Sequence, residues 1–203
     1  SINPEYLMSI YDRMVTESGA KVLFFSRLAA VEMSSDDTID AIIVSNKAGL
    51  VAFKGKVYID ATGDGDLAAW SGASFKRGYD EEGSVQMSSL CFSFANIDSY
   101  DYINGPTLYV WKDESTPLYK AVRSGKYPLV DTHFCNNLVG PDVIQCNAGH
   151  MTVDTTDPWA ISEAMILGRQ KAVQYLKAMK DVRPSTFSNA FVVKTASLLG
   201  VRD

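Results

Sequence analysis

Glycine and aspartate alternate over residues 63–66, within the run Ala61-Thr62-Gly63-Asp64-Gly65-Asp66. Glycines let a backbone turn sharply and come close to a ligand. Free amides in such a turn, beside the start of a helix, favour an anion such as a pyrophosphate. The carboxylates of Asp64 and Asp66 would repel a phosphate, but they accept hydrogen bonds from sugar hydroxyls. Small residues at positions 61 and 63 leave room for a flat ligand, so this turn is a candidate binding site.

Two other interpretations of the turn need no organic ligand. Acidic residues at a helix N-terminus cap its free amides in many α/β proteins. A calcium loop that begins at Asp60 would put Ser71 at its twelfth position, where such a loop requires a bidentate glutamate. Calcium is therefore rejected and no metal is expected, whereas ligand binding and simple capping both stay open.

The elements around this turn are typical of an α/β fold. Residues 3–18 predict a helix with one apolar face, formed by Tyr6, Leu7, Ile10, Tyr11 and Met14. Residues 21–25 and 57–60 are apolar and rich in β-formers without alternation, which is typical of parallel strands buried on both faces. Between them, short β-rich segments separated by turn residues predict an antiparallel meander at 28–32, 38–44 and 50–53. A helix is expected to follow the turn from Leu67.

From about residue 84 the pattern becomes that of an antiparallel sheet with helices. Leu90, Phe92 and Phe94 lie on one side of a predicted strand at 85–94. A short helix is expected near 116–124, and Asp157-Pro158 begins a long one. Its apolar stripe consists of Ile161, Met165, Gly168, Ala172, Tyr175 and Met179. We therefore predict a partial Rossmann-like layer with a meander at 1–83, and an α+β domain with an antiparallel sheet at 84–203.

Composition excludes several classes of protein. The chain has 203 residues, 46% of them hydrophobic and 21% charged, which is ordinary for a folded soluble domain. Its formal net charge of -5 gives no cationic surface for nucleic acid or an anionic membrane. No apolar run approaches the roughly 20 residues that span a bilayer. We expect a soluble, cytoplasmic protein, with export of a longer parent left open. Three scattered cysteines, Cys91, Cys135 and Cys146, predict reduced and mostly buried thiols.

A few other side chains could take part in chemistry. His133 and His150 are the only histidines, and either could transfer a proton, although a lone histidine is more often structural. Arg169 could face a substrate carboxylate, but an exposed arginine on a helix is commoner. Four aromatic residues of the segment 97–150 either line a substrate cleft or, as we favour, form the core of this β-rich segment. They are Tyr100, Tyr102, Tyr109 and Trp111.

In its order of elements the chain resembles the FAD-dependent oxidoreductase family of bacteria. The resemblance lies in the helix and strand of residues 4–23, the meander, the ATGDGD turn with its alanine-rich helix, and Gly200-Val201-Arg202. It implies an oxidoreductase that uses FAD on a small organic substrate. It also implies that 1–83 contact the cofactor, through Ala61, Thr62, Gly63, Asp64, Asp66 and, at the adenine edge, the backbone of Ser26-Arg27-Leu28. Arg202 becomes a candidate near the flavin, and catalytic residues stay unassigned.

The chain departs from the family pattern at two places. No GxGxxG turn for the FAD pyrophosphate occurs in it, and no later glycine-rich segment follows Asp203. We therefore expect an internal piece of a longer protein, inactive and weak in FAD binding by itself, with self-association through an incomplete face. The rival hypothesis is a non-enzymatic, β-rich interaction or carbohydrate-associated domain, suggested by the aromatic residues of 97–150.

Overall fold

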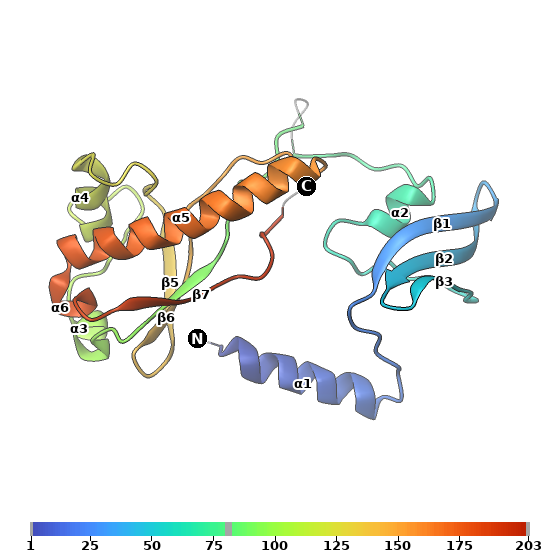
Figure 1. Ribbon diagram of the computed structural model, residues 1–203, viewed down its shortest axis with the longest axis horizontal. Coiled ribbons are helices and arrows are strands. Elements are labelled where there is room, and N and C mark those ends of the chain that lie inside the picture. Colours follow the sequence, from blue (N-terminus) through green and yellow to red (C-terminus); the bar gives the residue numbers. More distant parts are fainter. Residues whose placement is uncertain (1, 80–82, 202–203) are drawn as a thin grey trace. The chain divides into compact units, whose positions relative to one another are not determined.

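The computed structural model describes residues 2–79 and 83–201. Contacts divide the chain into two compact units, residues 5–84 and residues 85–203 with the first four residues. Each unit has an antiparallel sheet, one of three strands and one of four, combined with helices (Figure 1). The predicted mixed α/β class, with a meander and a separate antiparallel sheet, is confirmed.

The first unit is built on the predicted meander. Strands β1 (Arg27–Ser35), β2 (Thr38–Asn46) and β3 (Gly49–Phe53) pair in sequence order, each antiparallel to the next. The second turn forms where turn residues were expected. The Asn46 side-chain oxygen accepts a hydrogen bond from the amide of Ala48 at 2.9 Å. Gly49 then takes a φ of 102°, which a residue with a side chain rarely adopts.

The prediction of two parallel strands beside this meander is wrong. Residues 21–25 and 57–60 form no strand, and Phe25 has a φ of 51°, outside the β region. Their apolar side chains are exposed, Phe25 to 99% and Ile59 to 82%. A strand forms where a neighbour pairs its backbone and covers its side chains, so β-propensity alone does not decide it. Within the described residues, neither segment has such a neighbour.

Helix α1 (Pro4–Glu17) forms where it was predicted, but none of its residues is buried. The expected apolar face is exposed at Tyr6, Ile10, Tyr11 and Met14. Together with residues 21–25 and 57–59, this is a large amount of exposed apolar surface for one small unit. Self-association through such a surface stays a prediction.

The short helix α2 (Asp66–Trp70) follows the ATGDGD turn, as expected. Gly65 is its N-cap residue and has a φ of 69°, a left-handed conformation that glycine adopts without strain. Helix α2 contacts β1, which attaches the turn to the meander.

The second unit contains the four-stranded sheet, in the order β5-β6-β4-β7, with every neighbouring pair antiparallel. Its strands are β4 (Phe92–Ala95), β5 (Phe134–Gly140), β6 (Val143–Ala148) and β7 (Phe191–Thr195). The strand predicted at 85–94 is therefore much shorter, with only isolated bridges at Ser88 and Ser89. Leu90, Phe92 and Phe94 are buried, as their alternation predicted.

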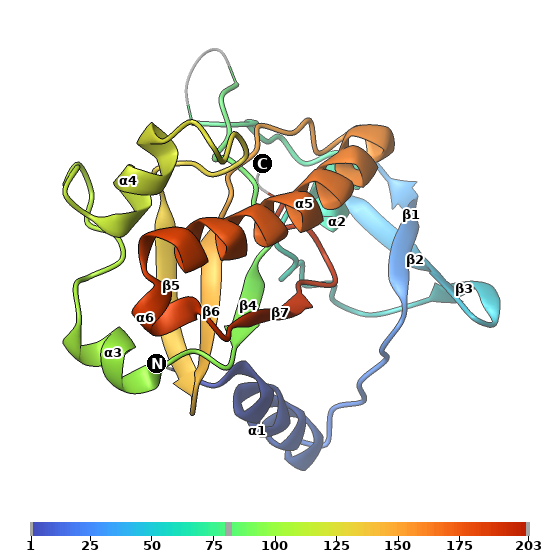
Figure 2. The same ribbon diagram turned by 60° about the vertical axis from the view of Figure 1, so that its left-hand side comes forward.

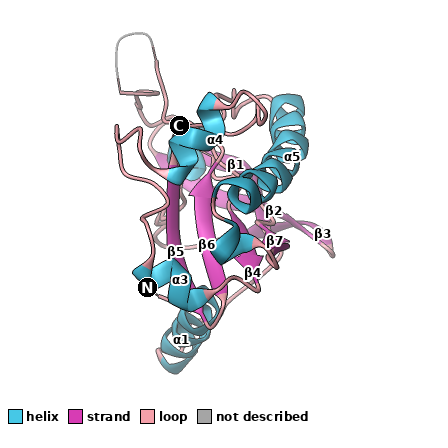
Figure 3. Ribbon diagram, turned by 90° about the vertical axis from the view of Figure 1, so that its left-hand side faces the viewer, coloured by secondary structure: helices cyan, strands magenta, loops and turns pink. Residues whose placement is uncertain are grey.

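Four helices accompany this sheet: α3 (Ser99–Asn104), α4 (Pro117–Arg123), α5 (Pro158–Val182) and α6 (Pro184–Phe187). Helix α5 runs across the strands, and the side view shows helices beside one face of the sheet (Figures 2 and 3). The side chain of Asp157 caps α5 by accepting a hydrogen bond from the amide of Trp159 at 2.8 Å.

The predicted stripe of α5 faces the core. Gly168, Ala172, Tyr175 and Met179 are buried, and Ile161 and Met165 pack against a smaller apolar cluster around Leu90. The ring of Tyr175 lies 5.5 Å from the rings of both Phe92 and Phe134, measured between centroids. This aromatic packing fixes α5 on the sheet and places the hydroxyl of Tyr175 beside Asp131.

Candidate functional site

The ATGDGD turn is organised by a residue that precedes it, Asp60. Its Oδ1 accepts hydrogen bonds from the amide and the hydroxyl of Thr62, at 3.0 and 2.7 Å. Its Oδ2 accepts one from the amide of Ala68 in the first turns of α2, at 3.0 Å. The Thr62 hydroxyl, followed by these backbone amides, lowers the pKa of Asp60. Asp60 is therefore an ionised cap for α2, which the sequence analysis did not assign.

The predicted binding residues lie together on this turn and face solvent. Ala61, Thr62, Gly63 and Asp64 are exposed, and Asp66 is half-buried. A Cβ added at Gly63 or at Gly65 would meet no atom within 4 Å, so open space adjoins both glycines. A ligand can therefore approach the backbone of the turn closely.

The turn fits the hydroxyl-bearing part of a dinucleotide better than its phosphates. The amide of Gly65 already donates to the Thr62 hydroxyl at 3.0 Å, and that of Ala68 to Asp60. An anion would have to displace these oxygens and would also approach the carboxylates of Asp64 and Asp66. Sugar hydroxyls, by contrast, donate to carboxylates.

Leu28, the remaining predicted contact, lies in β1 and is half-buried, with its backbone opposite Val44. A hollow of about 410 Å³ lies where the end of β1 meets α2, and Met33 and Trp70 are among its lining residues. Leu28 is at the other end of the strand, and the residues that line this hollow do not include it or Ala61–Asp66. Residues 61–66 thus lie together because they are consecutive in the chain, and Leu28 does not lie among them.

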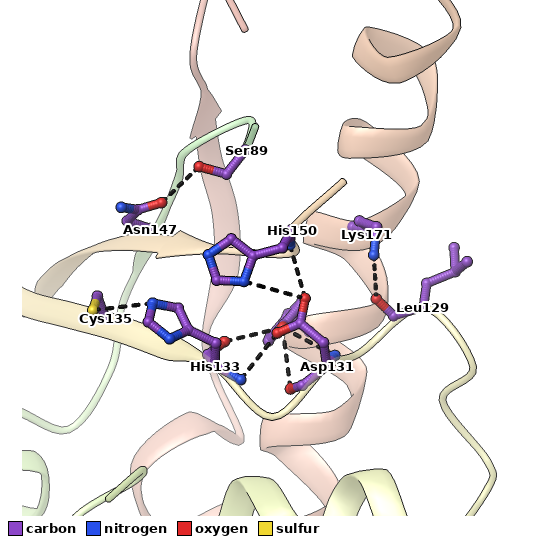
Figure 4. Close-up of polar contacts among 9 residues, drawn as sticks. Ser89, Leu129, Asp131, His133, Cys135, Asn147, His150 and Lys171 are labelled. Atoms are coloured by element: carbon purple, nitrogen blue, oxygen red, sulfur yellow. Dashed lines mark hydrogen bonds and ion pairs between the residues drawn. The ribbon is translucent and has the colours of Figure 1, made fainter. Parts of the chain in front are cut away.

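A second cluster of polar side chains lies in the unit of the four-stranded sheet. The imidazole rings of His133 and His150 lie 4.3 Å apart between centroids, at neighbouring ends of β5 and β6 (Figure 4). The Nε2 atom of His133 lies 3.3 Å from the sulfur of Cys135. The Nδ1 atom of His150 lies 3.9 Å from Oδ2 of Asp131. Two histidines that looked unrelated in the sequence are thus neighbours.

Asp131 holds these two histidine segments together. Its Oδ1 accepts a hydrogen bond from the amide of His133 at 3.0 Å, and its Oδ2 accepts one from the amide of His150 at 2.8 Å. The Tyr175 hydroxyl, from α5, donates to Oδ1 at 2.9 Å. Just before His150, Gly149 has a φ of 74° and packs against Lys171 and Tyr175, so a side chain there would be strained.

Burial shifts the pKa of three side chains in and beside this cluster, His133, Lys171 and Tyr175. It lowers the pKa of His133, and electrostatic interaction with His150 lowers it further, against the opposing effect of Asp131. Burial also lowers the pKa of Lys171, whose Nζ donates to the carbonyl of Leu129 at 3.1 Å. The pKa of Tyr175 is raised by burial. At neutral pH His133 is therefore an uncharged imidazole, able to accept a proton.

Sequence reasoning named the two histidines but missed Asp131, Cys135 and Tyr175 as their partners. A signal was available. His133 precedes Pro141 by eight residues and His150 follows Asp142 by eight, so a hairpin that turns at 141–142 brings them together. The structure has this hairpin, with Gly140 opposite Val143 and Phe134 opposite Ala148.

The other residues that the sequence suggested for a role in chemistry fall into three groups. Arg169 is exposed on α5, and Arg202 lies outside the described residues. Tyr102 and Tyr109 pack against the core, as we favoured, whereas Tyr100 and Trp111 are exposed. All three cysteines are free, and Cys146 is buried and Cys91 half-buried. Cys135 is exposed, because it lies on the face of β5 that α5 does not cover. The expectation of a buried thiol is therefore wrong for this residue.

Two findings bear on the class of site. Across residues 2–79 and 83–201, no three His, Cys, Asp or Glu side chains are grouped so as to hold a metal ion. Over the same part of the chain, no helix has both the length and the apolar character needed to cross a membrane.

Comparison with known proteins identifies the family. The sequence model of the family described as FAD dependent oxidoreductase matches residues 1–203. The chain therefore belongs to the FAD-dependent oxidoreductase family. No curated protein and no solved structure was found to match it.

Proposed function

We propose that the protein takes part in an FAD-linked oxidation or reduction of a small organic substrate, with residues 1–83 contacting FAD and residues 84–203 forming the substrate domain. The family match over 1–203 carries this proposal. Bound FAD supplies the redox chemistry, and the protein binds the reactants, orients them and moves protons.

On the cofactor side we assign Ala61, Thr62, Gly63, Asp64 and Asp66, with Leu28 as a weaker contact. The exposed turn, its open glycines and its two carboxylates support contact with the hydroxyls of the ribose or ribityl chain. We do not assign the pyrophosphate to this turn, because Thr62 and Asp60 already accept hydrogen bonds from the amides of Gly65 and Ala68.

On the substrate side we assign His133 as the group that accepts or returns a proton, with His150 beside it. The neutral state of His133 at pH 7 and its half-buried position next to β5, beside the His150 ring, support this role. Asp131 is a positioning residue, since it touches both histidine backbones and is itself held by Tyr175.

The turn by itself binds FAD weakly. Two or three hydrogen bonds, each worth on the order of 1 kcal/mol or somewhat more, oppose an immobilisation cost of roughly 4 kcal/mol or more. We therefore expect a dissociation constant no tighter than about millimolar.

Equilibrium dialysis of the protein against FAD tests the cofactor assignment. The doubly substituted protein Asp64→Asn, Asp66→Asn should lose most of the bound FAD. Asp36→Asn is a matched control, because Asp36 is an exposed aspartate in the turn between β1 and β2. Equal binding by all three proteins would remove the site from this turn. A dissociation constant in the low micromolar range would contradict the expected weak binding and would show a more complete FAD site than this turn provides.

A further inference from the structure

The four-stranded sheet has a second face, opposite the one that packs on α5. Phe92, Phe134 and Cys146 point into the core, so alternation places Cys91, Cys135 and Asn147 on the opposite face. A hollow of about 340 Å³ opens there. Its lining residues include Cys91, Cys135, Asn137, Gln145 and Asn147.

One side of this hollow carries a thiol next to a base. Cys135 is exposed, and its sulfur lies 3.3 Å from Nε2 of His133. The imidazole is held by its surroundings, with the ring of His150 at 4.3 Å and that of Tyr109 at 5.6 Å between centroids. Figure 4 shows the Cys135–His133 contact and, beside it, Asn147 accepting a hydrogen bond from the Ser89 hydroxyl at 2.6 Å.

The polar groups of the hollow indicate what could enter it. Among the described residues that line it there is no charged side chain, and three of them are amides, Asn137, Gln145 and Asn147. Amide N–H groups donate hydrogen bonds to a carbonyl oxygen and stabilise negative charge that develops on it. At about 340 Å³ the hollow is near the lower end of the size range of ligand pockets, which suits a small organic molecule. The hollow thus favours a small, uncharged compound with a carbonyl group.

We propose that Cys135 and His133 form a reactive thiol site, which adds to small, uncharged α,β-unsaturated carbonyl compounds bound in this hollow. This site goes beyond the FAD-linked function and does not depend on bound FAD.

The addition is balanced without another reagent. The S–H bond of Cys135 breaks and its proton moves to Nε2 of His133, while a sulfur electron pair forms a bond to the β-carbon. The electrons of the carbon–carbon double bond move to the carbonyl oxygen, near the amides of the hollow. The proton then returns from Nε2 to the α-carbon, which restores the carbonyl. The net change is addition of S–H across the double bond, with no oxidant and no leaving group.

The three cysteines allow a test within one molecule, using acrylamide as the probe and mass spectrometry to follow each residue at neutral pH. Cys135 should react at least about tenfold faster than Cys91, which lines the same hollow but contacts no imidazole among the described residues. Cys146 is fully buried and should not react, so its labelling would reveal unfolded protein. Equal rates at Cys135 and Cys91 in folded protein would overturn the proposal.

Two variants test whether the imidazole of His133, and not solvent exposure alone, makes Cys135 reactive. His133→Gln should slow labelling of Cys135 by about tenfold, whereas Tyr100→Gln, at an exposed position of α3 outside the hollow, should change it less than about twofold. The same experiment is repeated with acrylate, a charged analogue of acrylamide. For each probe, the rate at Cys135 is divided by the rate at a model cysteine peptide. This ratio should exceed one for acrylamide and should be close to one for acrylate. Unchanged labelling in His133→Gln with Cys146 still protected, or equal enhancement with acrylate, would contradict the proposed site.

Discussion

The phenol oxygen of Tyr175 lies 2.9 Å from Oδ1 of Asp131, which joins α5 to both histidine-bearing segments. The tyrosine is a fully buried residue of the core, and its hydroxyl reaches the carboxylate at the edge of the sheet. This contact therefore links the packing of α5 to the geometry of the imidazole pair.

Replacing Tyr175 with phenylalanine should cost about 1–3 kcal/mol of unfolding free energy, because the Asp131 carboxylate loses a donor that water does not easily replace. Urea unfolding measures this cost. Tyr100→Phe is the control, since Tyr100 is 79% exposed, and its unfolding free energy should change by less than about 0.5 kcal/mol. Equal stability of the two variants would show that the Tyr175 hydroxyl does not support Asp131.

Gly168→Ala tests the packing of α5 on the sheet. Alanine favours a helix by about 1 kcal/mol over glycine, yet its Cβ would lie 2.5 Å from Cβ of Leu90. We expect this close approach to outweigh the helix preference and to destabilise the protein by about 1–3 kcal/mol. Arg169→Ala, on the exposed side of the same helix, should be close to neutral in the same thermal unfolding experiment. A more stable Gly168→Ala protein would contradict the packing of Leu90 against α5.

An ion pair between a buried arginine and a half-buried aspartate predicts how the free energy of unfolding changes with pH. Arg183, which is 4% exposed, contacts the carboxylate of Asp101 with Nη2 at 3.2 Å from Oδ2. The Thr186 hydroxyl, with further contributions from Ser185 and Arg183, lowers the pKa of Asp101 below its ordinary value of 3.8. A lowered folded-state pKa stabilises the native protein above the ordinary value, and this contribution is lost as the pH falls through the folded-state pKa.

Unfolding free energy should therefore decrease on acidification from about pH 5 to pH 3, and Asp101→Asn should make this decrease shallower. The same variant should already be less stable at pH 7, because Arg183 is left buried without a charged partner. Asp36→Asn, at an exposed turn, should follow the parent protein. If Asp101→Asn keeps the full pH dependence, other carboxylates cause it.

Periodicity and turn chemistry predicted the local elements well. The stripe from Ile161 to Met179 predicted the buried face of α5, and the Asn46–Gly49 turn predicted the last hairpin of the meander. The segments at 21–25 and 57–60 were misjudged, because an apolar, β-rich sequence shows a tendency to pair but does not show whether a partner is present.

The candidate sites were predictable only in part. Composition and spacing identified the ATGDGD turn, but they attributed the capping to its own aspartates instead of Asp60. The imidazole pair required the register of the β5–β6 hairpin, and its link to Tyr175 required the packing of α5. A link of that kind joins residues 44 positions apart, and local sequence patterns do not contain it.

The most direct test of the central claim is an NMR titration of the backbone amides of residues 61–66 with FAD and, separately, with inorganic pyrophosphate. We expect FAD to shift these signals with an apparent dissociation constant of about a millimolar or weaker, because the turn offers only a few hydrogen bonds to its hydroxyls. Pyrophosphate should leave them in place, since Asp60 and Thr62 hold the amides of Ala68 and Gly65. Shifts confined to other parts of the chain, or a stronger response to pyrophosphate than to FAD, would contradict the assignment of this turn to the hydroxyl-bearing part of FAD.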